Sequence, residues 1–161
     1  MEHDNNGLAW CANTSVKGYS INITTIKCTT TSGDKNGSDN YEQMAEFEGI
    51  TDTTDLSNYP AFKFGKEYGT TNSLSAPYNE GWYLPSLAEL YAIYNVKTTV
   101  DAASDLCGGS QFGSSSYWSS SQYASTVSNV GAFFLDFSNG DGNVGSKSDF
   151  SGYVCAVRAF K

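Results

Sequence analysis

The carboxylate, hydroxyl and imidazole side chains are the first candidates for chemistry, and their spacing gives little support to catalysis. The chain has one histidine, His3, so a Ser-His-Asp or Cys-His site would have to recruit that residue from a polar N-terminal stretch. Asp136, Asp141 and Asp149 lie near each other in sequence, but no pattern places two of them in one apolar pocket for acid–base work. We therefore expect no catalytic residues.

Oxygen ligands for a metal ion cluster in one short segment. Asp34, Asn36, Ser38 and Asp39 lie within six positions, and calcium takes six to eight such ligands. An EF-hand loop that began at Asp34 would need glycine at its sixth position and an acid at its twelfth, where this chain has Asp39 and Ala45. A turn rich in Asp, Asn and Gly explains the segment better, so we expect no metal site and no cofactor.

The four cysteines do not pair as C-x-x-C, which disfavours a zinc ribbon or a thioredoxin-like motif. An even number of cysteines in a polar chain rich in tyrosine favours disulfides and an oxidising compartment, with Cys11–Cys28 and Cys107–Cys155 as the preferred pairs. Four buried thiols in a reducing compartment remain the alternative.

Length and charge exclude other classes of function. The chain has 161 residues and a net charge of -8, with Arg158 as its single arginine, so it lacks the clustered cations that bind nucleic acid. No apolar run approaches the 18 residues that a membrane span needs, and no signal peptide is recognisable at the N-terminus. We expect one domain over residues 8–161, most simply a monomer, after a disordered tail at 1–7.

Residue patterns predict an α+β fold. Helices are expected at 57–69 (ended by Gly69), from Ser86, and at 99–107; strands are expected within 19–31, from 115, at 132–137 and at 153–160. The clearest element is the helix from Ser86, where Ser86 and Glu89 form a capping box and the apolar positions recur with helical spacing. Those positions are Leu87, Leu90, Tyr91 and Tyr94. An Asn-Gly hairpin turn follows the strand 132–137, and 141–152 reads as a polar loop.

Three motifs together resemble a known family. They are G-W-Y-L-P-S with E-L at 81–90, Y-W-S-S-S at 117–121, and V-R at 157–158. This combination resembles bacterial surface domains typified by the C-terminal domain of the Legionella collagen-like adhesin, also described as the Fibrobacter major paralogous domain. The resemblance covers residues 57–161 well and 1–56 weakly.

The resemblance implies a C-type-lectin-like fold, a small twisted antiparallel sheet with flanking helices and long loops. The Glu-Pro-Asn, Gln-Pro-Asp and Trp-Asn-Asp motifs that hold calcium in true C-type lectins are missing here. The implied function is a non-enzymatic, adhesin-like or receptor-binding domain at a cell surface or on a phage particle, with a protein or glycan as its ligand. The alternatives are an enzyme of the formylglycine-generating type, for which no matching cysteine pair is visible, and a fixed structural paralogue.

The C-terminal region also resembles the variable proteins of diversity-generating retroelements. Mutation at template adenines cannot turn asparagine codons into Lys, Glu, Gln, Met or Trp, and of these five types only Lys147 occurs within 124–160. A region rich in glycine and serine in an acidic protein gives the same depletion. We place the variable ligand-display region at 120–160.

Within that region we expect the strand 132–137 and the loops on either side of it to carry the ligand surface. Polar loop positions place weak demands on folding, and interspersed apolar side chains supply anchors. The expected ligand-binding residues are Thr126, Val127, Ser128, Asn129, Phe133, Leu135, Asp141, Asn143, Val144, Ser146, Ser148, Asp149 and Phe150.

Overall fold

A computed structural model describes residues 3–21, 26, 32–49, 56–123 and 130–159, with side chains described from Gly7 onward. Its main feature is a five-stranded sheet in the order β1-β6-β3-β4-β5, in which β3 and β6 run parallel and the other neighbours antiparallel. A second sheet pairs β2 with β7. The strands are β1 (His3–Leu8), β2 (Trp82–Tyr83), β3 (Ser116–Gln122), β4 (Gly131–Asp136), β5 (Asp141–Ser146), β6 (Gly152–Cys155) and β7 (Val157–Arg158).

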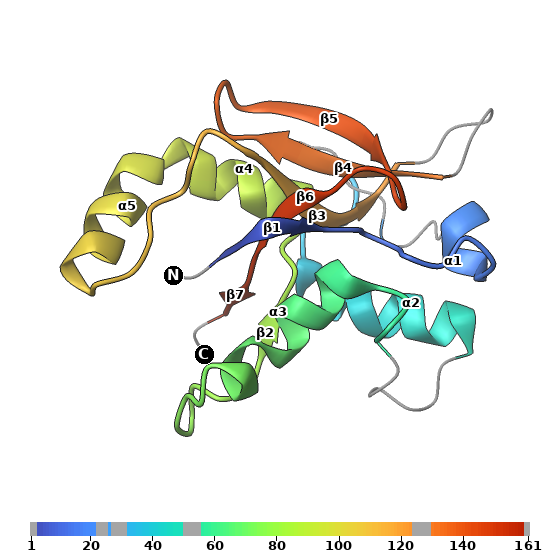
Figure 1. The fold of residues 1–161 in the computed structure, drawn as a ribbon, viewed down its shortest axis with the longest axis horizontal. Helices are drawn as coiled ribbons and strands as arrows, with labels where there is room; N and C mark the ends of the chain where they lie inside the picture. Colours follow the sequence, from blue (N-terminus) through green and yellow to red (C-terminus); the bar gives the residue numbers. More distant parts are fainter. Residues whose placement is uncertain (1–2, 22–25, 27–31, 50–55, 124–129, 160–161) are drawn as a thin grey trace.

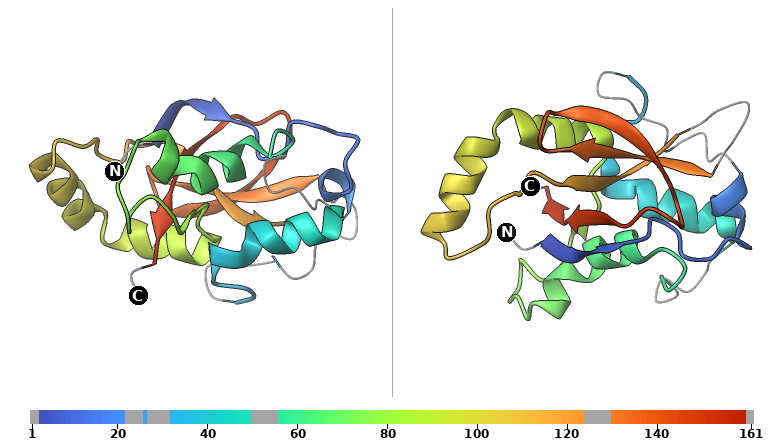
Figure 2. Two further views of the ribbon diagram at one scale, coloured as in Figure 1. Left: turned by 90° about the horizontal axis from the view of Figure 1, so that it is seen from below. Right: turned by 45° about the horizontal axis from the view of Figure 1, so that its top comes forward.

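Helices cover both faces of the larger sheet. Figures 1 and 2 show α2 and α3 together on one side, while α4 lies against β3 and β4 and α5 projects away from the sheet. The helices are α1 (Lys17–Ser20), the 3-10 helix η2 (Gly37–Asp39), α2 (Asn40–Glu48), α3 (Pro60–Thr71), α4 (Leu87–Asn95) and α5 (Lys97–Leu106). The mixture of helices and a mainly antiparallel sheet confirms the α+β class.

Two core clusters lie on the two faces of the sheet, because successive strand residues point to opposite sides. The fully buried Tyr117 and Trp118 illustrate this: Tyr117 packs with Leu135 in the cluster under α4, whereas Trp118 packs with Ala132 in the cluster under α2 and α3. Both aromatic residues belong to the Y-W-S-S-S motif. That motif therefore contributes one large ring to each core.

The helix predicted from Ser86 is confirmed, together with its capping box. The Ser86 hydroxyl accepts a hydrogen bond from the Glu89 N–H at 3.2 Å, and the Glu89 carboxylate accepts one from the Ser86 N–H at 2.8 Å. Leu87 and Leu90 are buried as expected. Tyr91 is not: it faces solvent, since α4 buries a narrower stripe than the sequence period suggested.

Glycine 69 does not end its helix. The helix predicted at 57–69 runs from Pro60 to Thr71, with proline in the first turn as expected. A Cβ at Gly69 would lie 2.3 Å from the carbonyl oxygen of Asn79, so the glycine permits close approach of the 76–81 segment. The helix expected at 99–107 is also present, as α5 over 97–106.

Strand expectations need four corrections. Residues 3–7, expected within a disordered tail, form β1 together with Leu8 by pairing with β6. The segment 17–20 is helical, and most of the strand region expected at 19–31 lies outside the described residues. The polar segment 141–146, expected to be a loop, is β5, held by the Asn139–Gly140 turn. The strand expected at 153–160 is divided between β6 and β7, which belong to different sheets.

The described cysteines are free thiols. Cys11 and Cys155 are buried, whereas Cys107 is exposed at the end of α5. The expected Cys107–Cys155 bridge is therefore absent: Cys155 lies inside the sheet at β6, away from the solvent-facing helix end. Cys28, the expected partner of Cys11, lies outside the described residues.

Candidate ligand-binding surface

Pairing of β4 with β5 places two of the expected ligand-binding residues side by side. Phe133 and Val144 are direct partners in this antiparallel register, and the ring of Tyr123 meets that of Phe133 edge-on, with centroids 5.5 Å apart. Val144 is 43% exposed and Tyr123 is 36% exposed, while Phe133 is half-buried. We name Tyr123, Phe133 and Val144 the hairpin patch. Tyr123 was not among the expected residues.

A glycine makes this arrangement possible. A Cβ at Gly131 would lie 2.6 Å from Val144 Cγ1 and 3.5 Å from the Tyr123 ring. The missing side chain lets Val144 approach β4 closely, so that the patch forms a continuous surface. Gly131 follows the segment 124–129, which holds the expected residues Thr126, Val127, Ser128 and Asn129 and lies outside the described residues.

Two of the carboxylates considered above as catalytic groups, Asp136 and Asp141, lie at the turn between β4 and β5. Asp136 Oδ1 accepts a hydrogen bond from the Ser138 N–H at 2.8 Å, and hydrogen bonds from Ser138 lower the pKa of this carboxyl. Gly140 adopts a φ of +81°, as an Asn-Gly turn requires. Asn139 binds both the N–H and the carboxylate of Asp141. These acids stabilise a turn, and Asp141 is exposed at the surface.

The opposite face of the hairpin carries packed aromatic rings, of which Trp118 is fully buried and Phe134 and Phe150 are half-buried. Phe134 and Phe150 stack with centroids 4.6 Å apart, and the Trp118 ring packs edge-on against both rings. Phe150, expected to be an apolar anchor for ligand, is half-buried in this stack and lies on the face opposite Val144. Leu135 is excluded from ligand contact, because it is fully buried in the cluster under α4.

The expected polar residues do not share one face. Asn143 is the partner of Phe134 and so points to the side opposite Val144. Past the end of β5, Asp149 accepts hydrogen bonds from the hydroxyls of Ser146 at 3.0 Å and Ser148 at 2.9 Å. Asn143 and Asp149 are exposed, and the two serines are half-buried. The structure therefore brings together Phe133 and Val144, and it separates this pair from the polar loop.

One buried charge in this region was missed. Lys147 has no exposed surface, and its amine donates hydrogen bonds to the carbonyl oxygens of Gly18 and Tyr19. Its position as the only lysine within 124–160 was a visible signal, although nothing in the sequence shows where its side chain points. Folding therefore requires a specific residue in the loop after β5, although the small, polar composition of that loop suggested that its residues could vary freely.

Two further hollows adjoin each other beside β2 and β7. They have volumes of about 420 and about 960 Å³ and share Tyr78, Trp82 and Arg158 in their linings. Arg158 donates to the carbonyl oxygens of Pro77 at 2.8 Å and Glu80 at 2.7 Å, and its guanidinium lies 5.4 Å from the centre of the Tyr78 ring. Trp82 pairs with Arg158 across the two strands, so residues of two family-like motifs build this corner of the fold.

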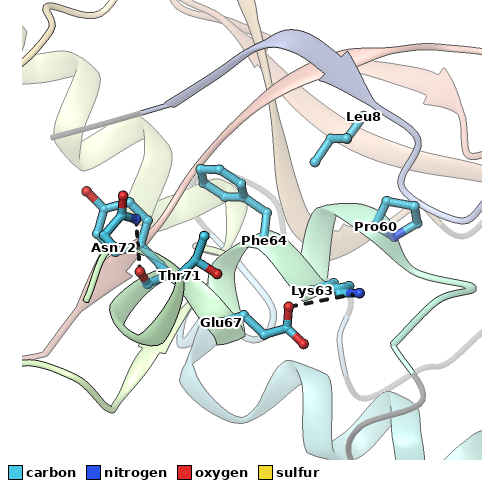
Figure 3. Close-up of a pocket in the computed structure, with 8 residues that line it drawn as sticks. Leu8, Pro60, Lys63, Phe64, Glu67, Thr71 and Asn72 are labelled. Atoms are coloured by element: carbon cyan, nitrogen blue, oxygen red, sulfur yellow. Dashed lines mark hydrogen bonds and ion pairs between the residues drawn. The ribbon is translucent and has the colours of Figure 1, made fainter. Parts of the chain in front are cut away.

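A smaller hollow of about 260 Å³ lies between β1 and α3 (Figure 3). Leu8, Pro60 and Phe64 supply its apolar walls, and the Lys63–Glu67 ion pair lies on its α3 side. The lysine and glutamate nitrogen and oxygen atoms are 4.0 Å apart on adjacent helical turns. The hollow holds no convergent set of polar groups of the kind that orients a small ligand.

Metal-ligating side chains do not gather in the part of the chain that the structure describes. Within that part, no group of three His, Cys, Asp or Glu side chains could hold a metal ion. The acidic segment near Asp34 is a turn: Asp34 accepts from the Asn36 N–H, and Asn36 accepts from the Ser38 N–H, each at 3.1 Å. Among the same described residues, no helix has the length and hydropathy needed to cross a membrane.

Comparison with known proteins adds no assignment. No protein-family model matches the chain, and no curated protein or solved structure gives a significant match. The family and the C-type-lectin-like fold therefore stay predictions from the sequence motifs.

Proposed function

We propose that this protein is a non-enzymatic binding domain of C-type-lectin-like fold that displays a ligand surface on its β4–β5 hairpin. The single observation that carries this proposal is the hairpin patch, three neighbouring apolar or aromatic side chains that remain partly exposed on a hydrogen-bonded, closely packed hairpin. An aromatic anchor held on a rigid element loses little freedom on binding, which favours affinity.

The chemistry of the patch favours a protein ligand over a glycan. Tyr123 and Phe133 present ring surface, and Val144 presents methyl groups, with no charged residue among the three. Such a surface matches the apolar centre of a protein–protein interface, which aromatic residues dominate and charged residues avoid.

A C-type-lectin-like arrangement is supported by the roles that the motif residues play. Glu89, from the first motif, caps α4 and also accepts hydrogen bonds from the Gly37 N–H at 3.0 Å and the Tyr83 hydroxyl at 2.9 Å. Arg158, from the last motif, holds the 77–80 segment. These contacts fix long connections to the sheet and leave the hairpin to vary. We further propose a location at a bacterial cell surface or on a phage particle.

Display of selected variants tests the binding role directly. Positions 123, 126–129, 133 and 144 are randomised together in a phage-displayed library and selected against hen egg-white lysozyme as a probe protein. A matched library randomises 118, 134 and 150, the packed aromatic positions on the opposite face. We expect folded binders from the first library and unfolded, non-binding clones from the second. Equal failure of both libraries contradicts the proposed ligand surface.

Diversification by a retroelement is the proposed source of variation, and the neighbouring DNA tests it. A reverse transcriptase gene and an adenine-rich near-copy of the segment encoding 120–160 are expected nearby. Their absence would identify a fixed paralogue and would leave the binding proposal to be decided by the display experiment.

A further inference from the structure

Helix α1 is a single turn held at both ends by ionisable side chains from distant parts of the chain. At its start, Glu48 of α2 accepts a hydrogen bond from the Lys17 N–H at 3.2 Å and another from the Gly18 N–H. At its end, Lys147 donates to the carbonyl oxygens of Gly18 and of Tyr19, the latter at 3.2 Å. The Glu48 carboxylate thus satisfies N–H groups, and the Lys147 amine satisfies carbonyl oxygens, that a helix leaves unpaired at its ends.

Lys147 is firmly built into this position. Its ammonium nitrogen lies 4.9 Å from the centre of the Trp10 ring, and the side chain has no exposed surface. Its main-chain N–H donates to the carbonyl oxygen of Val130 and its carbonyl oxygen accepts from the Cys11 N–H, both at 2.9 Å. Lys147 therefore joins the N-terminal segment, α1 and the start of β4 at one point. Figure 1 shows α1 at the same end of the molecule as the connection from β5 to β6.

The groups around the amine oppose each other in their effect on its charge. Burial lowers the pKa of Lys147 to about 7, and this effect exceeds the attraction of Cys11 and Glu48, which favours the charged amine. Burial also raises the pKa of the Cys11 thiol and of the Tyr59 hydroxyl, which donates a hydrogen bond to Glu48. Proton uptake near neutral pH therefore falls on Lys147 and not on these two neighbours.

We propose that Lys147 and Glu48 form a proton-sensitive clasp, which holds α1 against the β5–β6 connection while the Lys147 amine is neutral and loosens when that amine takes up a proton. A neutral amine can still donate to both carbonyl oxygens, because it keeps two N–H groups. A protonated amine also keeps these bonds but must bury a full charge, so it favours conformations in which the nitrogen reaches water. The clasp is independent of whether the hairpin patch binds a ligand.

The direction of the pH effect follows from the two protonation states. In the closed form the amine loses its proton at about pH 7, whereas a solvated lysine keeps it to about 10.5. Between these values the open form binds one more proton, so the closed form loses stability as pH falls from about 10 to about 7 and changes little below that. Opening of α1 should rise by up to about tenfold per pH unit within this window.

Two measurements on the intact chain test the clasp. The first follows the ¹³Cε chemical shift of Lys147 with pH, for which we expect a midpoint near 7. The second follows amide-exchange protection of Tyr19 and Ile21, whose N–H groups bond to Val16 and Lys17, relative to the unstructured chain. Protection should fall as pH drops from 9 to 7. A midpoint near 10.5, or protection that does not vary with pH, overturns the proposal.

Three variants assign the effect to the clasp. Lys147→Met keeps the length of the side chain and removes the proton, so protection of α1 should become independent of pH. Lys63→Met, a lysine on the surface of α3, should leave the pH dependence unchanged. Glu48→Gln keeps an acceptor and removes the attracting charge, so the Lys147 midpoint should move further down. If Lys147→Met does not fold, the midpoint shift in Glu48→Gln decides, and an upward or absent shift refutes the clasp.

Discussion

The two faces of the β4–β5 hairpin carry similar residues and have different surroundings. One face presents Phe134, which stacks on Phe150 and meets the edge of Trp118. The other presents Phe133 and Val144, of which Val144 stays 43% exposed. The alternation of a strand decides which residues share a face, but elements distant in sequence decide whether that face is covered. Phe133, Phe134 and Phe150 are all half-buried, so the faces differ in their other members. Trp118 is fully buried on one side, whereas Tyr123 and Val144 are exposed on the other.

Each face also changes along its length. On the patch side, Phe133 is half-buried, but Leu135, two residues further along β4, is fully buried in the cluster that also contains Leu87 and Leu90 of α4. β4 therefore passes from core to surface between Leu135 and Phe133, where α4 no longer covers the strand. Substitutions on either side of this boundary should differ sharply in cost.

The largest effect is expected at Leu135. Leu135→Ala should lower the free energy of unfolding by about 2–5 kcal/mol, because it opens a cavity where no solvent reaches. Urea denaturation followed by circular dichroism measures the loss. A cost below about 1 kcal/mol would show that α4 does not cover this end of β4.

The packed aromatic face can be tested with glycines of the neighbouring strand. A Cβ at Gly145 would lie 3.0 Å from both Phe150 and Trp118, whereas one at Gly142 would meet Leu87 at 3.5 Å, an ordinary contact. Gly145→Ala should therefore destabilise by about 1–3 kcal/mol through overpacking, and Gly142→Ala should cost much less. Thermal denaturation of the two variants compares them, and equal melting temperatures would contradict the packing of this face.

Local sequence signals predicted the parts of the fold that short-range contacts determine. The capping box at Ser86 and Glu89 and the Asn139–Gly140 turn both depend on residues within four positions, and both are present. The strand β1 was missed because its sequence, H-D-N-N-G-L, has no strand pattern, and it forms only by pairing with β6 at the other end of the chain.

The candidate site was predicted in part for the same reason. Phe133 and Val144 were both expected at the ligand surface, but their direct pairing was not predicted, because 141–146 was expected to be a loop and not the second strand of the hairpin. Phe150 and Lys147 could not be placed correctly, since their environments come from Trp118 and from α1, about 30 and more than 120 residues away in sequence. Composition alone made their segment look like a freely variable loop.

The packing of α4 on the sheet can be weakened by a substitution at the N-terminal cap of this helix. Ser86→Ala removes the acceptor for the Glu89 N–H and the 2.7 Å hydrogen bond that the Ser86 hydroxyl donates to the Lys35 carbonyl oxygen. We expect a loss of about 0.5–2 kcal/mol in the free energy of unfolding. Ser86→Thr, which keeps a hydroxyl, should recover much of it in the same urea titration. If Ser86→Ala left the free energy of unfolding unchanged, the cap would not hold α4 on the sheet.

The smallest effect on stability is expected on the exposed side of the boundary, at Val144. This residue is the direct partner of Phe133 and stays 43% exposed, so Val144→Ala should lower the free energy of unfolding by no more than about 1 kcal/mol. Apolar side chains that are cheap to remove from the free protein can still anchor an interface, because a bound partner would bury them fully. In a lysozyme binder selected from the hairpin library with valine retained at 144, the same substitution should weaken binding by about tenfold or more, measured by surface plasmon resonance. The matched substitution Ala92→Ser, on the exposed side of α4, should change stability by no more than about 0.7 kcal/mol through helix propensity and should leave binding unchanged. If the Val144→Ala variant unfolds, Val144 is a core residue. If the variant binds with unchanged affinity, Val144 is not part of the ligand surface.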